Sequence, residues 1–326
     1  MNAVTLRLGS RRSPMAVAQS RRVADQITAA TGREVEIVGV TTLGDVSRAA
    51  LSQIGGTGVF VSALRDALLH GEIDFAVHSL KDLPAVQPPD IALAAVPRRD
   101  DPRDALVARA GAKLADLPAG ARIGTGSLRR AAQVLALRAD LRCVPIRGNA
   151  DTRMAKIGKG EVDAVVLAYA GLERIGHLDA VTQVFEPEEM LPAPGQGALA
   201  VECRTTDSDL AELLSVVSDA HTVAASIAER SLLEALAAGC HAPVAAYAAA
   251  TAPRAGDNGV SGERGLDMHA VVMSMNGTTM LRAHGVGRPA NARQLGQDLA
   301  ADLLRSGAEE LIRMPEEPAN SGNDVQ

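Results

Sequence analysis

Strand-like and helix-like segments alternate along the first half of the chain, and this alternation constrains the fold more than any other feature of the sequence. Apolar stretches typical of strands, at residues 4–8, 35–41 and 73–77, are separated by helical patterns that begin at Pro14 and span residues 60–69. Strands that alternate with helices in this way form βαβ units around a largely parallel sheet. We therefore expect an α/β lobe at the N-terminus.

A second series of the same kind follows the proline- and charge-rich residues 96–103. Residues 71–77 and 160–166 also share the pattern Gly-Glu-(Ile/Val)-Asp-x-(Ala/Val)-Val, each at the end of a helix and the start of a strand. Two lobes with similar winding are the simplest interpretation, although one short match is weak evidence of duplication. The predicted elements of the second series are strand 122–124, helix 128–137, strand 141–146, helix 152–157 and strand 164–167.

The last third of the chain changes pattern after a short strand at residues 198–202. A helix is expected from about residue 222 to residue 238, and Gly239 is a suitable residue to end it. Strands then predominate, with a hairpin turn at Asn276-Gly277 and a final helix near residues 292–304. Helical periodicity places four residues on the apolar face of the first helix, namely Ala228, Leu232, Ala235 and Leu236.

The length of the chain supports more than one domain. Its 326 residues exceed the size at which a single core stops growing, about 250–300 residues. We predict an α/β fold of two similar lobes with mixed, largely parallel sheets, like those of periplasmic binding proteins, and a smaller α+β domain. The expected boundaries are residues 1–97 with 198–216 for the first lobe, 103–192 for the second, 220–314 for the third domain and 315–326 for a disordered tail.

Composition excludes several classes of function. The chain carries a formal net charge of −6 and contains no Trp, two Tyr and three Phe, so neither general affinity for nucleic acid nor base stacking is expected. No apolar run is long enough to span a membrane, and arginines interrupt the N-terminal apolar stretch, unlike a signal peptide. We expect a cytoplasmic protein that binds neither nucleic acid nor membranes.

Cys240 is the one cysteine whose position suggests chemistry. It follows a predicted helix end and precedes His241, in a turn where a thiolate could be exposed and nucleophilic, although a plain loop cysteine is an equal alternative. Cys143 and Cys203 lie in strand-like sequence and are expected to be buried and inert. The spacing of the three indicates neither a disulfide framework nor a metal site.

Arginines stand at or beside the starts of three predicted helices, in residues 11–14, 127–130 and 147–153. Helix N-termini carry partial positive charge, so cations there are disfavoured unless an anion is also present. With Ser13 and Ser127 as caps, each junction can form an anion cradle of N–H donors and guanidinium groups. Ordinary solubilising arginine is the alternative, and it fits Arg21-Arg22 and Arg98-Arg99.

The stretch from His78 to Pro84 follows a buried-looking strand, where α/β proteins place functional groups. A carboxylate at Asp82 among arginines could stabilise a cationic intermediate or exchange protons with a substrate nitrogen. Pairing with a lysine or capping of a turn is an equal alternative for Asp82. We expect His78 to be a hydrogen-bonded structural residue, and the glycines of residues 55–58 to hinge a flexible lid.

In this order, the motifs resemble those of the porphobilinogen deaminase, or hydroxymethylbilane synthase, family over residues 6–312. The resemblance rests on residues 11–14 (RRSP) with Gln19, 42–45 (TLGD), 76–84 (AVHSLKDLP), 101–105 (DPRDA), 124–130 (GTGSLRR), 147–149 (RGN) with Thr152 and Arg153, 194–198 (PGQGA) and Gly239-Cys240.

This resemblance implies that four porphobilinogen molecules are joined head to tail, each losing ammonia, and that water releases linear hydroxymethylbilane. It implies a transferase that is a monomer, needs no metal, and carries a dipyrromethane cofactor on Cys240 through a thioether. A thiolate can trap the electrophilic azafulvenium formed by loss of ammonia. Asp82 would be the catalytic residue, which stabilises the pyrrole and azafulvenium cations and moves protons during each condensation.

This chain departs from the family pattern at several positions, and the resemblance also implies which residues bind the cofactor and the substrate. Many members carry lysines in the lid where this chain has Gln53 and Thr57, and Gly126 and His241 replace a frequent serine and glutamine. The implied cofactor-binding residues besides Cys240 are Lys81, Thr125, Ser127, Arg129, Arg130, Arg147 and Gly148. The implied substrate-binding residues are Arg11, Ser13, Gln19, Phe60, Ser79, Arg153, Arg174 and Gln196.

Two other classes of function remain as alternatives. A two-lobed solute-binding or effector-sensing module would also bind carboxylates between its lobes. The absence of an export signal and of a helix-turn-helix segment, and the third domain with Cys240, argue against it. A generic transferase with a cysteine nucleophile would leave the arginine clusters unexplained.

Overall fold

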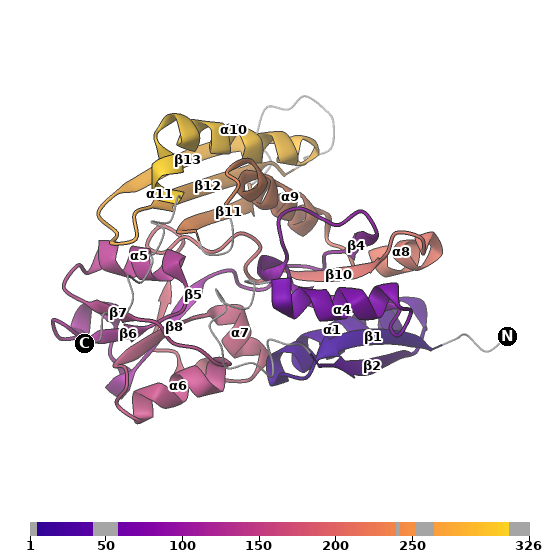
Figure 1. Ribbon diagram of the computed structural model, residues 1–326, viewed down its shortest axis with the longest axis horizontal. Coiled ribbons are helices and arrows are strands. Elements are labelled where there is room, and N and C mark those ends of the chain that lie inside the picture. The colour runs from indigo at the N-terminus through magenta and orange to yellow at the C-terminus, as the bar shows by residue number, and fades with distance from the viewer. Residues whose placement is uncertain (1–4, 42–57, 239–241, 252–263, 313–326) are drawn as a thin grey trace, which may run out of the picture.

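The computed structural model of the chain describes residues 5–41, 58–238, 242–251 and 264–312. Two α/β lobes lie side by side, and a third domain packs above them (Figure 1). Among the described helices, none taken singly is long and apolar enough to cross a membrane. Within the same described part of the chain, one bent pair, Ser208–Ser215 and Ala220–Ala235, meets the length and composition criteria when its two helices are taken together.

The first lobe is a five-stranded sheet with helices on both faces. Its strand order is β2-β1-β3-β10-β4, in which β1 pairs in parallel with β2 and β3, while β10 runs antiparallel to β3 and β4. Helices α1 and α8 cover one face and α4 the other. The strands are β1 (Leu6–Arg11), β2 (Val35–Val40), β3 (Phe75–Ser79), β4 (Ile91–Ala95) and β10 (Leu199–Arg204), and the helices are α1 (Pro14–Thr31), α4 (Gly58–Leu69) and α8 (Ser208–Ser215).

The second lobe has the same construction. Its strand order is β7-β6-β8-β5-β9, with β6 parallel to β7 and β8, and β5 antiparallel to β8 and β9. Helix α5 covers one face, and α6 and α7 cover the other. The strands are β5 (Asp104–Ala108), β6 (Arg122–Gly124), β7 (Arg142–Val144), β8 (Ala164–Ala168) and β9 (Gln183–Phe185), and the helices are α5 (Leu128–Leu137), α6 (Ala150–Gly158) and α7 (Tyr169–Arg174).

The sequence pattern shared by the two lobes has a structural role. In the first lobe, Asp74 accepts a hydrogen bond at 2.7 Å from the backbone N–H of Arg7 at the start of β1. In the second, Asp163 accepts one at 2.7 Å from the backbone N–H of Arg122, which starts β6. Each aspartate therefore fixes the start of the strand, β1 or β6, that pairs in parallel with a neighbour on both sides. The strand orders confirm the prediction of two similar lobes.

The third domain is a three-stranded antiparallel sheet covered by helices on one face. The predicted hairpin turn joins its second and third strands, where Gly277 has a φ of 72°, a value that favours glycine. Side chains such as Leu232 and Leu299 fill the core between the sheet and the helices. The elements are α9 (Ala220–Ala235), β11 (Val244–Ala250), β12 (Leu266–Met273), β13 (Met280–Gly287), α10 (Ala292–Arg305) and α11 (Ala308–Ile312).

One predicted helix differs in its end and its buried face. Helix α9 stops at Ala235, and the backbone turns at Ala237, whose φ is 48°, before Gly239 is reached. Because the helix ends early, Ala235 is exposed, whereas Leu236 is buried just beyond the last turn. Gly239 and Cys240 lie outside the described residues, as do the predicted lid at residues 42–57 and the tail at residues 315–326.

Candidate active site

The candidate site forms where loops at the ends of parallel strands from the two lobes meet. Strand β3 of the first lobe leads into a short 3-10 helix, Leu80–Asp82, and β6 of the second lobe leads through Thr125 to helix α5. Lys81 Nζ donates a hydrogen bond at 3.2 Å to Oε1 of Gln196, and Arg130 Nη2 of the second lobe donates to the same oxygen at 3.3 Å. Gln196 therefore bridges the two lobes at the site.

Asp104 is a buried carboxylate among the basic residues of the site. We call Lys81, Arg129, Arg130 and Arg153 the basic cluster. The carboxylate of Asp104 lies 2.8 Å from Nη2 of Arg129 and 2.8 Å from Nη2 of Arg130, and it accepts a bond at 2.9 Å from Nε2 of Gln196. Burial alone would raise the pKa of Asp104, but the two guanidinium charges and the Gln196 bond outweigh burial and lower it to about 2. Asp104 is therefore a permanent anion that holds two arginines in place.

Lys81 and Arg153 are cations whose charge the site does not fully balance. Burial, and then repulsion by Arg130, lower the pKa of Lys81 to about 8, against the attraction of Asp82 and Asp104. Burial and Arg130 likewise lower the pKa of Arg153 to about 10, against the attraction of Asp82. Burial is the larger cause of both shifts, and an anion bound beside these two cations would oppose it by favouring their charged forms.

The predicted helix caps are confirmed. Ser13 Oγ accepts from the backbone N–H of Ala16 at the start of α1, and Ser127 Oγ accepts from that of Arg130 at the start of α5. At the third junction the cap is Asn149, whose Oδ1 accepts from Thr152 N at 2.8 Å. A serine hydroxyl that accepts one bond can still donate another, so Ser13 and Ser127 keep a donor for a ligand.

Other predicted site residues lie on the same loops. Gln19 Nε2 donates at 2.9 Å to Oγ of Ser79, at the end of β3. Arg153 Nε donates at 2.8 Å to the backbone oxygen of Gly148, whose φ is 104°. Arg11 is the last residue of β1, and Arg147 lies between β7 and α6. Phe60 lies in α4, but its side chain is outside the described part of the structure.

Arg174, predicted to bind substrate, is paired with other groups of the protein in this structure. Its guanidinium is buried and donates to Oδ2 of Asp100 at 2.9 and 2.7 Å and to the backbone oxygen of Gly197 at 2.7 Å. Arg22 binds the other oxygen of Asp100 at 2.6 Å. Arg174 therefore ties α7 to the connections between the lobes.

Arg99 is a structural residue that sequence reasoning missed. We expected a solubilising side chain, but its Nη1 lies 2.6 Å from the buried carboxylate of Glu229, and its Nε donates to the backbone oxygen of Gln196 at 2.7 Å. Glu229 also accepts the backbone N–H groups of Gly195 and Ala248. Asp100 and Asp101 follow Arg99 directly and suggested local neutralisation. The true partner, Glu229, is far away in the sequence and could not be identified from it.

The prediction of a buried thiol is confirmed for Cys203, but Cys143 is only partly buried. The prediction of a hydrogen-bonded His78 is not met at Nε2, which has no hydrogen-bond partner among the described residues. His78 is buried, with Nε2 3.4 Å from Oε2 of Glu202, which also pairs with Arg65 at 2.7 Å. Burial raises the pKa of the Cys143 thiol to about 11 and also raises that of Cys203, which disfavours the reactive thiolate. Cys240 lies outside the described residues.

The fold and the site define a class of protein, a two-lobed α/β protein with a third domain and a basic site where the lobes meet. The family model described as porphobilinogen deaminase, dipyromethane cofactor binding domain, matches residues 6–212. The model of the porphobilinogen deaminase C-terminal domain matches residues 223–305. The chain belongs to the porphobilinogen deaminase family.

Curated relatives are similar over almost the whole chain. A porphobilinogen deaminase from Thermobifida fusca is 54% identical over 320 residues, covering 96% of this chain and 97% of that protein. Porphobilinogen deaminase 1 from Streptomyces coelicolor is 51% identical, covering 96% and 98%. Among solved structures, an ABC transporter periplasmic substrate-binding protein from Coxiella burnetii matches with a TM-score of 0.41 and 16% identity, covering 65% of this chain and 92% of that one.

Proposed function

We propose that this chain joins four porphobilinogen molecules head to tail into hydroxymethylbilane, releasing ammonia, with Asp82 at the reaction centre. The family supports the activity, which belongs to tetrapyrrole biosynthesis and makes the chain a transferase. The observation that carries the assignment to this site is the cluster of Lys81, Arg129, Arg130 and Arg153 around Asp82 and Asp104. Such an excess of cations suits a substrate and product with many carboxylates.

A dipyrromethane cofactor fits the residues of this site. Its acidic side chains would meet Lys81, whose pKa is lowered by burial and by repulsion from Arg130, and Arg129, whose buried Nε has no hydrogen-bond partner among the described residues. We propose that the group is held by these two with Thr125, Ser127, Arg130, Arg147 and Gly148. When bound through Cys240, it supplies the pyrrole carbon to which the first substrate is joined.

We propose that the incoming substrate is held mainly by the first-lobe loops and by the start of α6. Arg11 and Ser13 at the end of β1 and the start of α1, Ser79 at the end of β3, and Arg153 are the groups with suitable donors. Gln19 and Gln196 orient Ser79 and Lys81. Asp82 would stabilise the cation left when ammonia departs and accept the proton released as each bond forms. Arg174 would act indirectly, through the connection that contains Asp100.

We also propose the context in which the chain works. It would act as a cytoplasmic monomer on a small-molecule substrate, with neither nucleic acid nor a membrane as partner. The supporting observation is the acidic net charge of −6, which opposes nonspecific binding to anionic polymers. The proposed domains are residues 1–97 with 198–216, 103–192 and 220–314, and β10 supports the first boundary because it completes the first sheet.

The attachment to Cys240 is tested by intact-mass spectrometry of purified protein. We expect the wild-type chain to carry extra mass equal to two linked pyrroles and to give colour with an aldehyde reagent for pyrroles. Cys240→Ser should lose both signals, because the hydroxyl is a far weaker nucleophile than a thiolate. The matched control, Cys143→Ser, should keep them. An adduct that persists on Cys240→Ser would place the attachment elsewhere.

The electrostatic assignment of Lys81 can be tested by competitive labelling with a small amine reagent, read by mass spectrometry from about pH 6 to pH 11. In the cofactor-free Cys240→Ser protein, reactivity of Lys81 should rise as pH passes about 8, because its lowered pKa frees the amine there. In the cofactor-loaded protein, ligand carboxylates should move this rise to higher pH. Identical profiles for the two proteins would argue against contact between Lys81 and the cofactor.

A further inference from the structure

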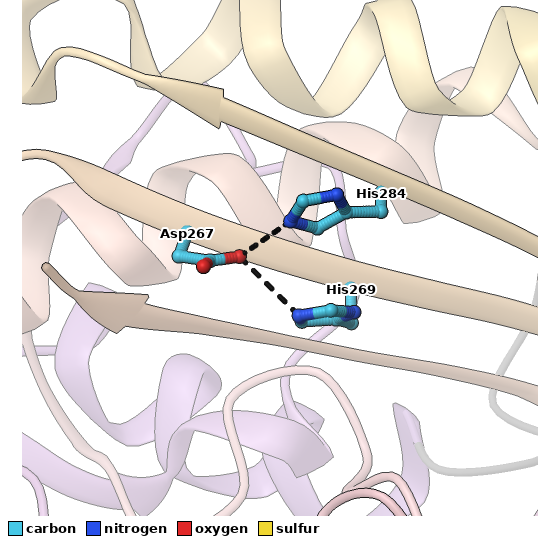
Figure 2. Close-up of side chains that lie close together, drawn as sticks. All are labelled: Asp267, His269 and His284. Atoms are coloured by element: carbon cyan, nitrogen blue, oxygen red, sulfur yellow. Dashed lines mark hydrogen bonds and ion pairs between the residues drawn. The ribbon is translucent and has the colours of Figure 1, made fainter.

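A second cluster of chemically active side chains lies on the third domain, on the sheet face opposite α10. His269 of β12 and His284 of β13 are directly opposite each other in the strand register. Asp267 precedes His269 by two residues, so alternation along the strand places it on the same face. Figure 2 shows the three side chains converging, with dashed lines from both imidazoles to the carboxylate.

The donor atoms of this Asp267-His269-His284 cluster have the spacing of a metal site. Nε2 of His284 lies 2.9 Å from Oδ1 of Asp267, and Nε2 of His269 lies 3.3 Å from the same oxygen. One potential ligand atom from each residue lies within 4.8 Å of the other two. Ligand atoms at 2.0–2.1 Å from a tetrahedral zinc ion are about 3.3 Å apart, so small side-chain rotations would suffice.

The strands that carry the cluster are well paired and packed, while the side chains of the cluster are open to solvent. Strands β12 and β13 pair over their full lengths, and Met268 and Ala270, on the opposite face, are buried against the third-domain helices. The cluster side chains are 37% exposed for Asp267, 56% for His269 and 53% for His284. An ion could therefore reach the site and keep water molecules as further ligands.

We propose that Asp267, His269 and His284 form a binding site for a divalent transition-metal ion of the zinc class. Two imidazole nitrogens and one carboxylate oxygen are the donor set preferred by Zn²⁺, Co²⁺, Ni²⁺ and Cu²⁺, whereas Mg²⁺ and Ca²⁺ prefer oxygen ligands alone. The two imidazole rings are stacked, with planes 25° apart and centroids 4.4 Å apart, and both Nε2 atoms lie beside Oδ1 of Asp267 (Figure 2). None of these residues belongs to the proposed condensation site.

The test is calorimetric titration of cofactor-loaded, tag-free protein with ZnCl₂ after removal of metals by a chelator. We expect one Zn²⁺ per chain at this site, and at least about tenfold weaker binding in His269→Ala and in His284→Ala. Zn²⁺ should also raise the midpoint of thermal unfolding of the wild type, because a ligand that binds only the folded state stabilises it. This increase should be lost in both variants.

A matched control is His177→Ala. Nε2 of His177 lies 2.7 Å from Oδ1 of Asp151, and the histidine is 40% exposed, but no second histidine contacts this pair among the described residues. His177→Ala should bind Zn²⁺ as the wild type does, and MgCl₂ should give no comparable heat. The proposal is overturned if wild-type protein binds no stoichiometric Zn²⁺, or if Zn²⁺ binding is unchanged in His269→Ala and His284→Ala. Folding of each variant is checked by its turnover, which should equal that of the wild type.

Discussion

Replacing Asp82 with asparagine is expected to lower kcat by about 10²–10⁴-fold while the protein stays folded and keeps its covalent cofactor. Asparagine preserves the shape of the side chain but can neither accept a proton nor balance a positive charge. Asp82 also helps to keep Lys81 and Arg153 charged, since its charge raises the pKa of both. The substitution should therefore lower the pKa of Lys81 further and increase KM for the acidic substrate toward alkaline pH.

The measurement is steady-state turnover, followed by ammonia release and product formation, together with the intact mass of the variant. Asp101→Asn is the matched control, because Asp101 is a half-buried carboxylate paired with Arg103 at 2.7 Å outside the basic cluster. It should retain most of the wild-type kcat. Near-normal product formation by Asp82→Asn would remove Asp82 from the chemistry, and loss of the pyrrole adduct would reassign it to cofactor assembly.

Replacing Asp104 with asparagine should destabilise the protein by about 3–5 kcal/mol, because two guanidinium groups would remain buried without their counter-ion. Arg129 and Arg130 both contact this carboxylate, and the charge of Lys81 also interacts with it. Asparagine has nearly the same volume, so the effect isolates charge from packing. The free energy of unfolding, from denaturant titration at neutral pH, measures it. An unchanged value would mean that the arginines find another anion.

The same carboxylate gives a pH dependence of known sign. Its folded-state pKa is lowered to about 2 from 3.8, so its contribution to stability is present above about pH 4 and is lost as pH falls toward 2. Asp104→Asn should lack this part of the acid-induced loss of stability. The control is Asp140→Asn, whose partner Arg138 contacts it at 2.7 Å near the surface, and which should have little effect on unfolding.

The parts of the fold that depend on local sequence could be predicted. Strand β6 and helix α5 begin and end at the predicted residues, because Gly124 and the Ser127 cap mark their boundary. Strand β5 was missed, because it starts with the charged Asp104, and only remote arginines make burial of that residue tolerable. Residues 198–216 were assigned to the first lobe, but the place of β10 between β3 and β4 was not predicted, since its partners lie more than a hundred residues earlier.

In the candidate site, too, features set by local sequence could be predicted and features set by distant contacts could not. Arginines at capped helix starts were visible in the sequence. The structure brings three of them close enough to interact electrostatically with Lys81 or Asp82, namely Arg129, Arg130 and Arg153. The roles of Arg99 and Arg174 were not visible, since Glu229 and Asp100 reach them only through tertiary packing. Pairing of distant charges depends on the final fold and not on spacing along the chain.

The position of β10 also bears on the order in which the chain becomes structured during synthesis. Among the described strands of the first sheet, β4 hydrogen-bonds only to β10, so this sheet cannot be completed until residue 204 has left the ribosome. The second sheet uses strands from residues 104–185 alone. We therefore expect the second lobe to be able to complete its sheet before the first lobe does. Until β10 is synthesised, the edge of β3 remains unpaired and prone to aggregation.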